Sequence, residues 1–71
     1  MTLGQRISLY RKKLNISQEE LGARLGVSRQ AVSKWESGAS DPSTSNLLAL
    51  ARLYGVSAEE LLREAAGTQR T

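Results

Sequence analysis

The sequence predicts an all-α protein made of five short helices around one core. Apolar side chains recur three or four positions apart in successive stretches, which is the spacing of one helix face. A serine or threonine precedes each stretch, as expected for helix N-caps. A glycine or asparagine follows each of the first four stretches, as expected for helix ends. The sequence contains no alternating strand pattern, internal repeat or low-complexity run.

Composition limits the function. The chain has 71 residues, enough for one domain. It contains no cysteine and no histidine, which excludes disulfides, zinc fingers and histidine acid–base catalysis. It also lacks a phosphate-binding glycine loop and a nucleophile–base set, so we expect neither an enzyme nor a bound metal or cofactor. No long apolar run suggests a signal peptide or a membrane span, and the expected location is cytoplasmic.

The positive charge is concentrated in the first half of the chain. The net charge is +3. Residues 1–38 carry seven basic and three acidic residues, a balance of +4, whereas residues 39–71 carry three basic and four acidic residues, a balance of −1. A basic face attracts polyanions such as nucleic acid. Ordinary solubilising charge is the alternative interpretation, and charge alone does not separate the two.

The first helix is predicted over residues 3–14. Thr2 and Gln5 have the spacing of a capping box. Asn15 suits a left-handed helix end. Three basic residues lie in the last turn, where cations interact favourably with the helix dipole. The expected inward-facing stripe consists of Leu3, Ile7, Tyr10 and Leu14.

Residues 18–37 predict two helices joined by a tight turn. Ser17, which has a glutamate three residues later, has the spacing of a capping box, and Ser28 is the expected N-cap of the second helix. Gly26 permits the left-handed backbone that ends the first helix. Gly22 lacks a side chain where the second helix would cross the first. Two short helices meeting steeply around a tight turn are typical of a DNA-binding helix-turn-helix.

The second helix of this pair, at residues 28–36, has a polar and basic outward face without carboxylates. Val32 and Trp35 have the i, i+3 spacing of its inward side. In the major groove of DNA, arginine pairs with guanine and glutamine pairs with adenine, so the outward face is a candidate for base contacts. A solvated helix face without a ligand is the alternative. The outward residues are Arg29, Gln30, Ser33, Lys34 and Ser37.

Two more helices complete the prediction. Residues 39–43 form the longest irregular stretch and hold the only proline. Ser43 is the expected N-cap of a helix over residues 44–54. Ser57, again with a glutamate three residues later, has the spacing of a capping box and opens a helix over residues 58–65.

Short motifs at defined spacings cover residues 3–64. They are I-x-x-Y-R at Ile7–Arg11, SQEELG at Ser17–Gly22, GVSRQAVSKWESG at Gly26–Gly38, Pro42, L-x-x-L at Leu47–Leu50 and GVSAEELL at Gly55–Leu62. In these motifs the chain resembles the lambda-repressor-like family, also called the XRE family of helix-turn-helix regulators. The resemblance implies a compact five-helix fold with the helix-turn-helix in helices two and three. It also implies a prokaryotic or phage-type protein that lies on the nucleoid when bound to double-stranded DNA.

The resemblance implies roles for individual residues. Base contacts are implied at Ser28, Arg29, Gln30, Ser33 and Lys34. Phosphate contacts are implied at Arg11, Ser17, Gln18, Ser37 and Ser40. Structural roles are implied at Arg11, Gly22, Gly26, Trp35 and Glu36. Among these, Arg11 and Glu36 are expected to form a partly buried salt bridge, and Gln18 stands at a helix N-terminus, which offers free N–H groups to an anion. For Gln18, simply filling the first helical position is the alternative.

The loop after the third helix departs from the family pattern. Relatives often carry lysine or arginine there, in contact with the DNA backbone, whereas this chain has Ala39, Ser40 and Asp41. A carboxylate in that loop repels phosphate if it points toward DNA. We therefore expect a single copy to bind DNA with limited affinity.

The leading functional hypothesis is sequence-specific binding of double-stranded DNA by a transcriptional regulator that represses by occupying its operator. The alternative is an antitoxin-like or other protein-interaction module of the same fold. A protein-binding face typically carries aromatic or aliphatic anchors, whereas the outward face of the third helix is polar.

We expect residues 1–66 to form the domain and residues 67–71 a flexible tail. Leu61 and Leu62 are expected to return to the core. A single helix-turn-helix reads too few base pairs for useful specificity in a genome, which favours two copies on a pseudo-palindromic operator, with half-sites ~34 Å apart. Leu53, followed by Leu62, is the best candidate for an exposed contact between copies. Two leucines fall far short of the ~1,200 Å² of a stable interface, so we expect a free monomer that pairs on DNA.

Overall fold

The computed structural model describes residues 1–67, which form five helices and contain no strand. The predicted all-α, five-helix fold is confirmed. The helix α5 extends to Gly67, two residues beyond its predicted end, and the rest of the predicted tail lies outside the described residues. The helices are α1 (Leu3–Lys13), α2 (Gln18–Leu25), α3 (Arg29–Ser37), α4 (Thr44–Tyr54) and α5 (Ala58–Gly67).

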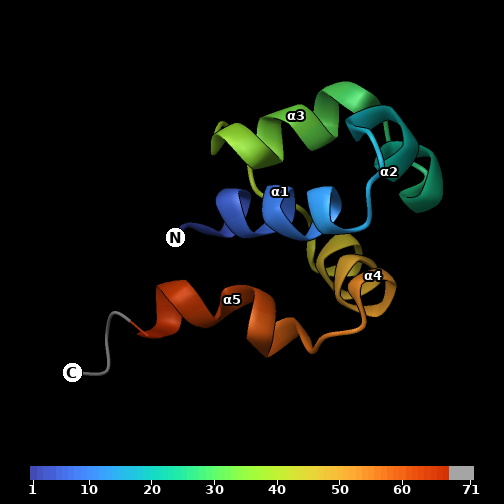
Figure 1. Cartoon of the computed structure of the whole chain (residues 1–71). Coiled ribbons are helices and arrows are strands. Elements are labelled where there is room, and N and C mark those ends of the chain that lie inside the picture. The colour runs from blue at the N-terminus through green and yellow to red at the C-terminus, as the bar shows by residue number, and fades with distance from the viewer. Residues whose placement is uncertain (68–71) are drawn as a thin grey trace.

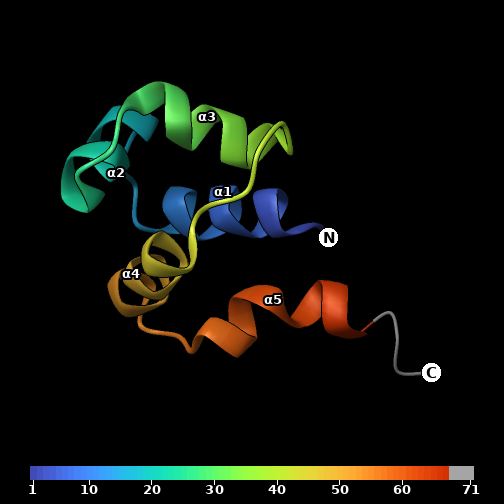
Figure 2. The same cartoon turned by 180° about the vertical axis from the view of Figure 1, so that it is seen from behind.

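The helix α1 lies at the centre of the molecule, between α3 on one side and α5 on the other (Figures 1 and 2). The short helix α2 crosses the beginning of α3, and α2 and α4 meet near the C-terminal end of α1. This arrangement leaves one long side of α3 without a helix packed against it, while its other side rests on α1 and α2.

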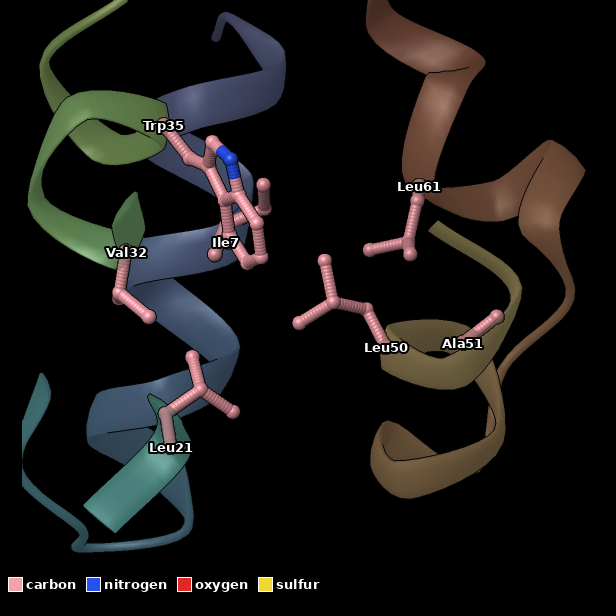
Figure 3. Packing of buried hydrophobic residues seen from close by; sticks show 7 residues of the cluster. All are labelled: Ile7, Leu21, Val32, Trp35, Leu50, Ala51 and Leu61. Atoms are coloured by element: carbon pink, nitrogen blue, oxygen red, sulfur yellow. The ribbon is translucent and has the colours of Figure 1, made fainter. Parts of the chain in front are cut away.

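Each helix contributes at least one fully buried apolar side chain to a single core (Figure 3). Burying one such side chain stabilises the fold by roughly 1.5–3 kcal/mol relative to leaving it exposed. Since the five helices share this core, the orientation of α3 depends on packing across the whole domain. The core residues are Ile7, Leu21, Val32, Trp35, Leu50, Ala51 and Leu61.

Three leucines do not lie where the sequence pattern predicts. Leu14 is exposed, because α1 ends at Lys13 and Asn15 turns the chain with a φ of 63°, so the inward stripe stops at Tyr10. Leu62 is exposed, whereas Leu61 is buried, so the expected return of Leu62 to the core is wrong and its other expected role as an exposed leucine stands. Leu53 is half-buried and packs against the core, so it is not the exposed leucine of α4.

The N-caps are confirmed, but only one of the three predicted capping boxes is complete. Thr2 and Gln5 exchange both hydrogen bonds. The Ser17 and Ser57 hydroxyls each accept the N–H of the glutamate three residues later. Those glutamates do not bond back to the cap, because each carboxylate pairs with an arginine: Glu20 with Arg24, and Glu60 with Arg6 and Arg63.

Two glycines allow helices to approach closely. A Cβ on Gly22 would lie 2.7 Å from the Val27 carbonyl oxygen and 3.2 Å from that of Ser28. The close approach predicted at Gly22 is therefore made by the turn and the N-cap of α3, where the second helix begins. Gly4 was not predicted to matter. A Cβ there would collide with the carbonyl oxygens of Trp35 and Glu36. The backbone of α1 therefore touches the C-terminal turn of α3, and any side chain at Gly4 would separate the two helices.

Candidate nucleic-acid interface

The turn between α2 and α3 fixes where α3 begins. Gly26 ends α2 with a φ of 76°, which is the left-handed conformation predicted for it. The Ser28 hydroxyl then accepts the N–H of Ala31 at 3.1 Å and caps α3. Val32 and Trp35 are buried and set the rotation of α3 about its axis. The N-terminal turn of α3 is consequently presented at the surface.

The outward face of α3 carries polar side chains that are free of intramolecular bonds. Arg29, Gln30 and Lys34 are all exposed. Within residues 1–63, whose side chains are described, none of these three forms a side-chain hydrogen bond or ion pair. Ser33 is half-buried beside them. The predicted base-contact residues therefore share one surface, and three of them offer all their side-chain donors to a partner.

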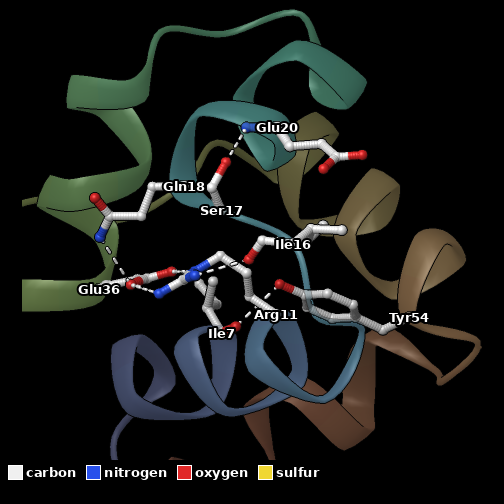
Figure 4. Close-up of polar contacts among 8 residues, drawn as sticks. All are labelled: Ile7, Arg11, Ile16, Ser17, Gln18, Glu20, Glu36 and Tyr54. Carbon is white, nitrogen blue, oxygen red and sulfur yellow. Dashed lines mark hydrogen bonds and ion pairs between the residues drawn. The ribbon is translucent and has the colours of Figure 1, made fainter.

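A polar junction ties α1, α2 and α3 together behind this face (Figure 4). The Arg11 guanidinium donates to both carboxylate oxygens of Glu36, from Nε at 2.7 Å and from Nη2 at 3.2 Å. The two side chains are only 13% and 8% exposed, so the predicted partly buried salt bridge is confirmed. The hydrogen bond to Glu36 raises the pKa of Arg11, although burial acts in the opposite direction.

Gln18 belongs to the same junction, which the sequence pattern did not indicate. Its Nε2 donates to Oε1 of Glu36 at 3.0 Å, and Figure 4 shows it above the carboxylate, at the start of α2. Arg11 donates once more, from Nη1 to the carbonyl oxygen of Ile16 at 2.9 Å. Glu36 thus connects three helices through one carboxylate. We name Arg11, Gln18 and Glu36 the polar junction.

Most of the predicted phosphate-contact residues also bond within the chain. The Ser17 hydroxyl accepts the N–H of Glu20 at 3.0 Å. The Ser37 hydroxyl donates to the Lys34 carbonyl oxygen at 3.2 Å and accepts the N–H of Ala39 at 3.3 Å. The backbone N–H of Ser40 donates to the same carbonyl at 3.3 Å, while its side chain is exposed. Ser17 therefore caps the start of α2, and Ser37 and Ser40 form hydrogen bonds at the end of α3.

Tyr54 fastens α4 to α1, a role that the sequence pattern did not reveal. Its hydroxyl donates to the Ile7 carbonyl oxygen at 2.9 Å, and its ring stacks on Tyr10, with 5.2 Å between the ring centres. Burial raises the pKa of Tyr54, and the nearby charge of Glu36 adds to the effect. This hydrogen bond cannot be predicted from the sequence, because it depends on the three-dimensional path of α1.

Among residues 1–63, whose side chains the structure describes, no group of three or more acidic, cysteine or histidine side chains is placed to hold a metal ion. Within residues 1–67, no helix is long and apolar enough to cross a membrane.

A family model for helix-turn-helix proteins matches residues 7–61. Repressor protein C2 of Salmonella phage P22 is 44% identical over 61 residues, which are 86% of this chain and 28% of that protein. The HTH-type transcriptional activator BcrR of Enterococcus faecalis is 37% identical over 62 residues, which are 87% of this chain and 30% of that protein. The chain therefore spans less than a third of these two relatives.

A solved structure supports the same assignment. The crystal structure of the P22 c2 repressor protein in complex with a synthetic operator superposes on this chain with a TM-score of 0.84 and 43% sequence identity. The match covers 89% of this chain and 96% of that one. The family match, the relatives and the superposition agree with the geometry of α2 and α3, and the chain belongs to the lambda-repressor-like family of helix-turn-helix proteins.

Proposed function

We propose that the chain is a sequence-specific module for double-stranded DNA in a transcriptional regulator, and that it represses by occupying its operator. The observation that carries the proposal is the contrast between the unbonded outward face of α3 and the bonded polar junction behind it. A relative named as a repressor and a structure of a repressor bound to an operator support it. The module acts by binding, in the cytoplasm, and not as an enzyme.

In this proposal α3 is the recognition helix and its N-terminal turn enters the major groove. Arg29 pairs with a guanine and Gln30 with an adenine, each through two hydrogen bonds. Lys34, one turn later, reaches a base edge or a phosphate. Ser28 and Ser33 lie beside these contacts and complete the surface that meets the bases.

Phosphate contacts hold the recognition helix in register. Gln18 is the central residue, since its Nε2 has a second N–H for a phosphate oxygen after one is given to Glu36. Ser17 lies beside it, at the N-terminus of α2, where N–H groups favour anions. Ser37 and Ser40, at the end of α3, contact phosphates of the same DNA strand. Arg11 uses three donors internally and contributes mainly by holding Glu36.

The alternative as a protein-interaction module is less well supported. A protein-binding surface on α3 would carry apolar or aromatic anchors, whereas Arg29, Gln30 and Lys34 are exposed there. The exposed leucines of α4 and α5 are Leu48 and Leu62, away from α3.

We further propose that the chain is a monomer in free solution and pairs on a pseudo-palindromic operator. Leu48 replaces Leu53 as the exposed leucine of α4 that can contact a second copy, together with Leu62. Sedimentation of the free chain, and then of the chain with a duplex carrying two half-sites, tests the idea. One copy in solution and two on the duplex are expected. A stable dimer without DNA, or one copy on a two-site duplex, would refute it.

Salt dependence tests DNA binding itself. The logarithm of the affinity should fall linearly with the logarithm of the salt concentration, with a slope of about −0.9 for each phosphate neutralised. The Lys34→Ala variant should bind more weakly, and its slope should be smaller by about 0.9 if Lys34 reaches a phosphate. Affinity that stays constant from low to physiological salt would contradict the proposed function.

A further inference from the structure

A shallow hollow of about 640 Å³ lies between α1 and α3 and reaches the start of α2. One part of its lining belongs to the surface that we propose meets DNA. The other part comes from the outward side of α1, to which no role has been given. The six lining residues that matter here are Gln18, Ser33 and Ser37 from α2 and α3, and Ser8, Leu9 and Lys12 from α1.

Among the described residues that line the hollow, Lys12 supplies the basic side chain. The lining also includes Glu36, but that carboxylate accepts two hydrogen bonds from Arg11 and one from Gln18, so its charge is already compensated. The Lys12 side chain is exposed, and no hydrogen bond or ion pair occupies it within residues 1–63. The hydroxyls of Ser8 and Ser33 provide further donors. An ammonium group with hydroxyl and amide donors around it is the chemistry that binds a phosphodiester.

We propose that this hollow holds a phosphate and its sugar from the DNA strand that flanks the base pairs read by α3, with Lys12 as the cation. The proposal rests on the proposed function and extends the DNA surface from α3 onto α1. Two observations select DNA as the occupant. The hollow is continuous with the proposed phosphate site, since Gln18 lines both, and its unpaired charge is positive. Leu9, which is 37% exposed, gives the sugar an apolar surface.

The adjacent lysine provides a matched control. Lys13 has the same charge as Lys12 and is also exposed, but it does not line the hollow. Its ammonium lies 5.7 Å from the centre of the Tyr10 ring, and Tyr10 stacks on Tyr54 of α4. Replacing either lysine with alanine removes one positive charge from α1, but only Lys12→Ala removes it from the hollow.

The first experiment measures DNA affinity by fluorescence anisotropy from 50 to ~300 mM salt, a range in which phosphate contacts dominate the salt dependence. Lys12→Ala should make the log–log slope smaller by about 0.9, with the same loss on a preferred and an unrelated duplex, because a phosphate contact carries no sequence information. Lys13→Ala should leave the slope nearly unchanged. Equal slopes for the two variants, or an unchanged slope for Lys12→Ala, would overturn the proposal.

Shortening the duplex tests the place of the phosphate. Base pairs are removed one at a time from the end of the site, and wild type is compared with Lys12→Ala at each length. The difference in affinity between them should disappear at one step, when the flanking phosphate is lost. A difference that persists down to the bases read by α3 would contradict a flanking phosphate.

A second pair of variants tests for a gain of binding. Leu9→Lys places a new cation in the hollow, whereas Leu48→Lys places one at an exposed leucine on α4. Leu9→Lys should steepen the slope by about 0.9 and tighten binding at low salt, and Leu48→Lys should not. Equal salt slopes for the two variants would contradict phosphate binding in the hollow. If wild type itself shows no salt-dependent DNA binding, the proposed function fails; if it does and the matched pairs agree with each other, only this inference fails.

Discussion

The polar junction and the outward face of α3 use similar side chains in opposite ways. In the junction, Arg11 and Gln18 direct their donors to one carboxylate, at distances of 2.7–3.2 Å. On the outward face, Arg29 and Gln30 are exposed and make no side-chain bond within residues 1–63. An arginine and a glutamine thus fix the helices in one place and remain available to a partner in the other.

The difference follows from burial. Arg11 lies one helical turn after Ile7 on the inward side of α1, where an uncompensated charge would be costly, so it requires Glu36 as a partner. Arg29 stands in the first turn of α3, in water, where an intramolecular ion pair would add little. The rigid junction fixes the position of α3, and the free face keeps the hydrogen-bonding capacity that base recognition needs. Changes in the two regions should therefore affect different properties.

The largest effect is expected on breaking the junction. Arg11→Met leaves the Glu36 carboxylate buried without its main partner, which should lower the free energy of unfolding by ~3–5 kcal/mol. Adding Glu36→Gln should recover part of that loss, and a double-mutant cycle should give a coupling energy above about 1 kcal/mol. Urea unfolding followed by the fluorescence of Trp35 measures both. Additive effects would mean that the pair does not hold the helices together.

Gly4→Ala should destabilise the same region from its other side. The new methyl group would meet the backbone oxygens of Trp35 and Glu36, which cannot move without displacing α3. The expected loss is ~1–3 kcal/mol in the free energy of unfolding, as for other overpacked sites. Ala23→Gly, at an exposed position of α2, is the control and should cost only about 1 kcal/mol through helix propensity. A Gly4→Ala protein as stable as wild type would show that α1 and α3 can separate freely.

Substitutions on the outward face of α3 should weaken DNA binding without lowering stability. Arg29→Ala and Gln30→Ala should each weaken binding to the preferred duplex by ~1–3 kcal/mol. The free energy of unfolding should change by less than about 0.5 kcal/mol, because surface substitutions without partners rarely cost more. Anisotropy titrations and urea unfolding of the same preparations give the two values. A large loss of stability in either variant would mean that this face has a structural role.

Gln18 lies between the two regions, and the smallest change is expected there. Gln18→Ala removes one hydrogen bond to Glu36, worth ~1 kcal/mol of stability or somewhat more for a charged acceptor. It should also weaken binding to every duplex by a similar factor, since a phosphate contact is independent of sequence. Comparing affinities for preferred and unrelated duplexes checks this. A loss confined to the preferred duplex would assign Gln18 to base recognition instead.

Local signals predicted most of the fold, because they depend on residues close together in the sequence. The N-caps at Ser17 and Ser28 and the helix end at Gly26 lie where the sequence indicates. The exposure of Leu14 could not be predicted from periodicity, since it depends on where α1 stops. The ion pair between Glu60 and Arg6 could not be predicted either, because Arg6 lies on another helix.

Part of the candidate site came from the pattern of α3, and part from family resemblance. The outward placement of Arg29, Gln30 and Lys34 followed from helical spacing, whereas the bridge between Arg11 and Glu36 was implied by the resemblance alone. Neither the helical pattern nor the family resemblance indicated the hydrogen bond between Gln18 and Glu36. A sequence does not show that two residues 18 positions apart form a hydrogen bond until the angle between α2 and α3 is known.

We expect the outward face of α3 to read the base sequence, while the polar junction only holds α3 in place. A binding selection from a randomised duplex library, with wild type and Arg29→Ala in parallel, tests this most directly. Wild type should yield a motif, and Arg29→Ala should yield the same motif with the preference lost at one base pair, a guanine in the wild-type site. An unchanged motif, or no motif for wild type, would contradict the claim.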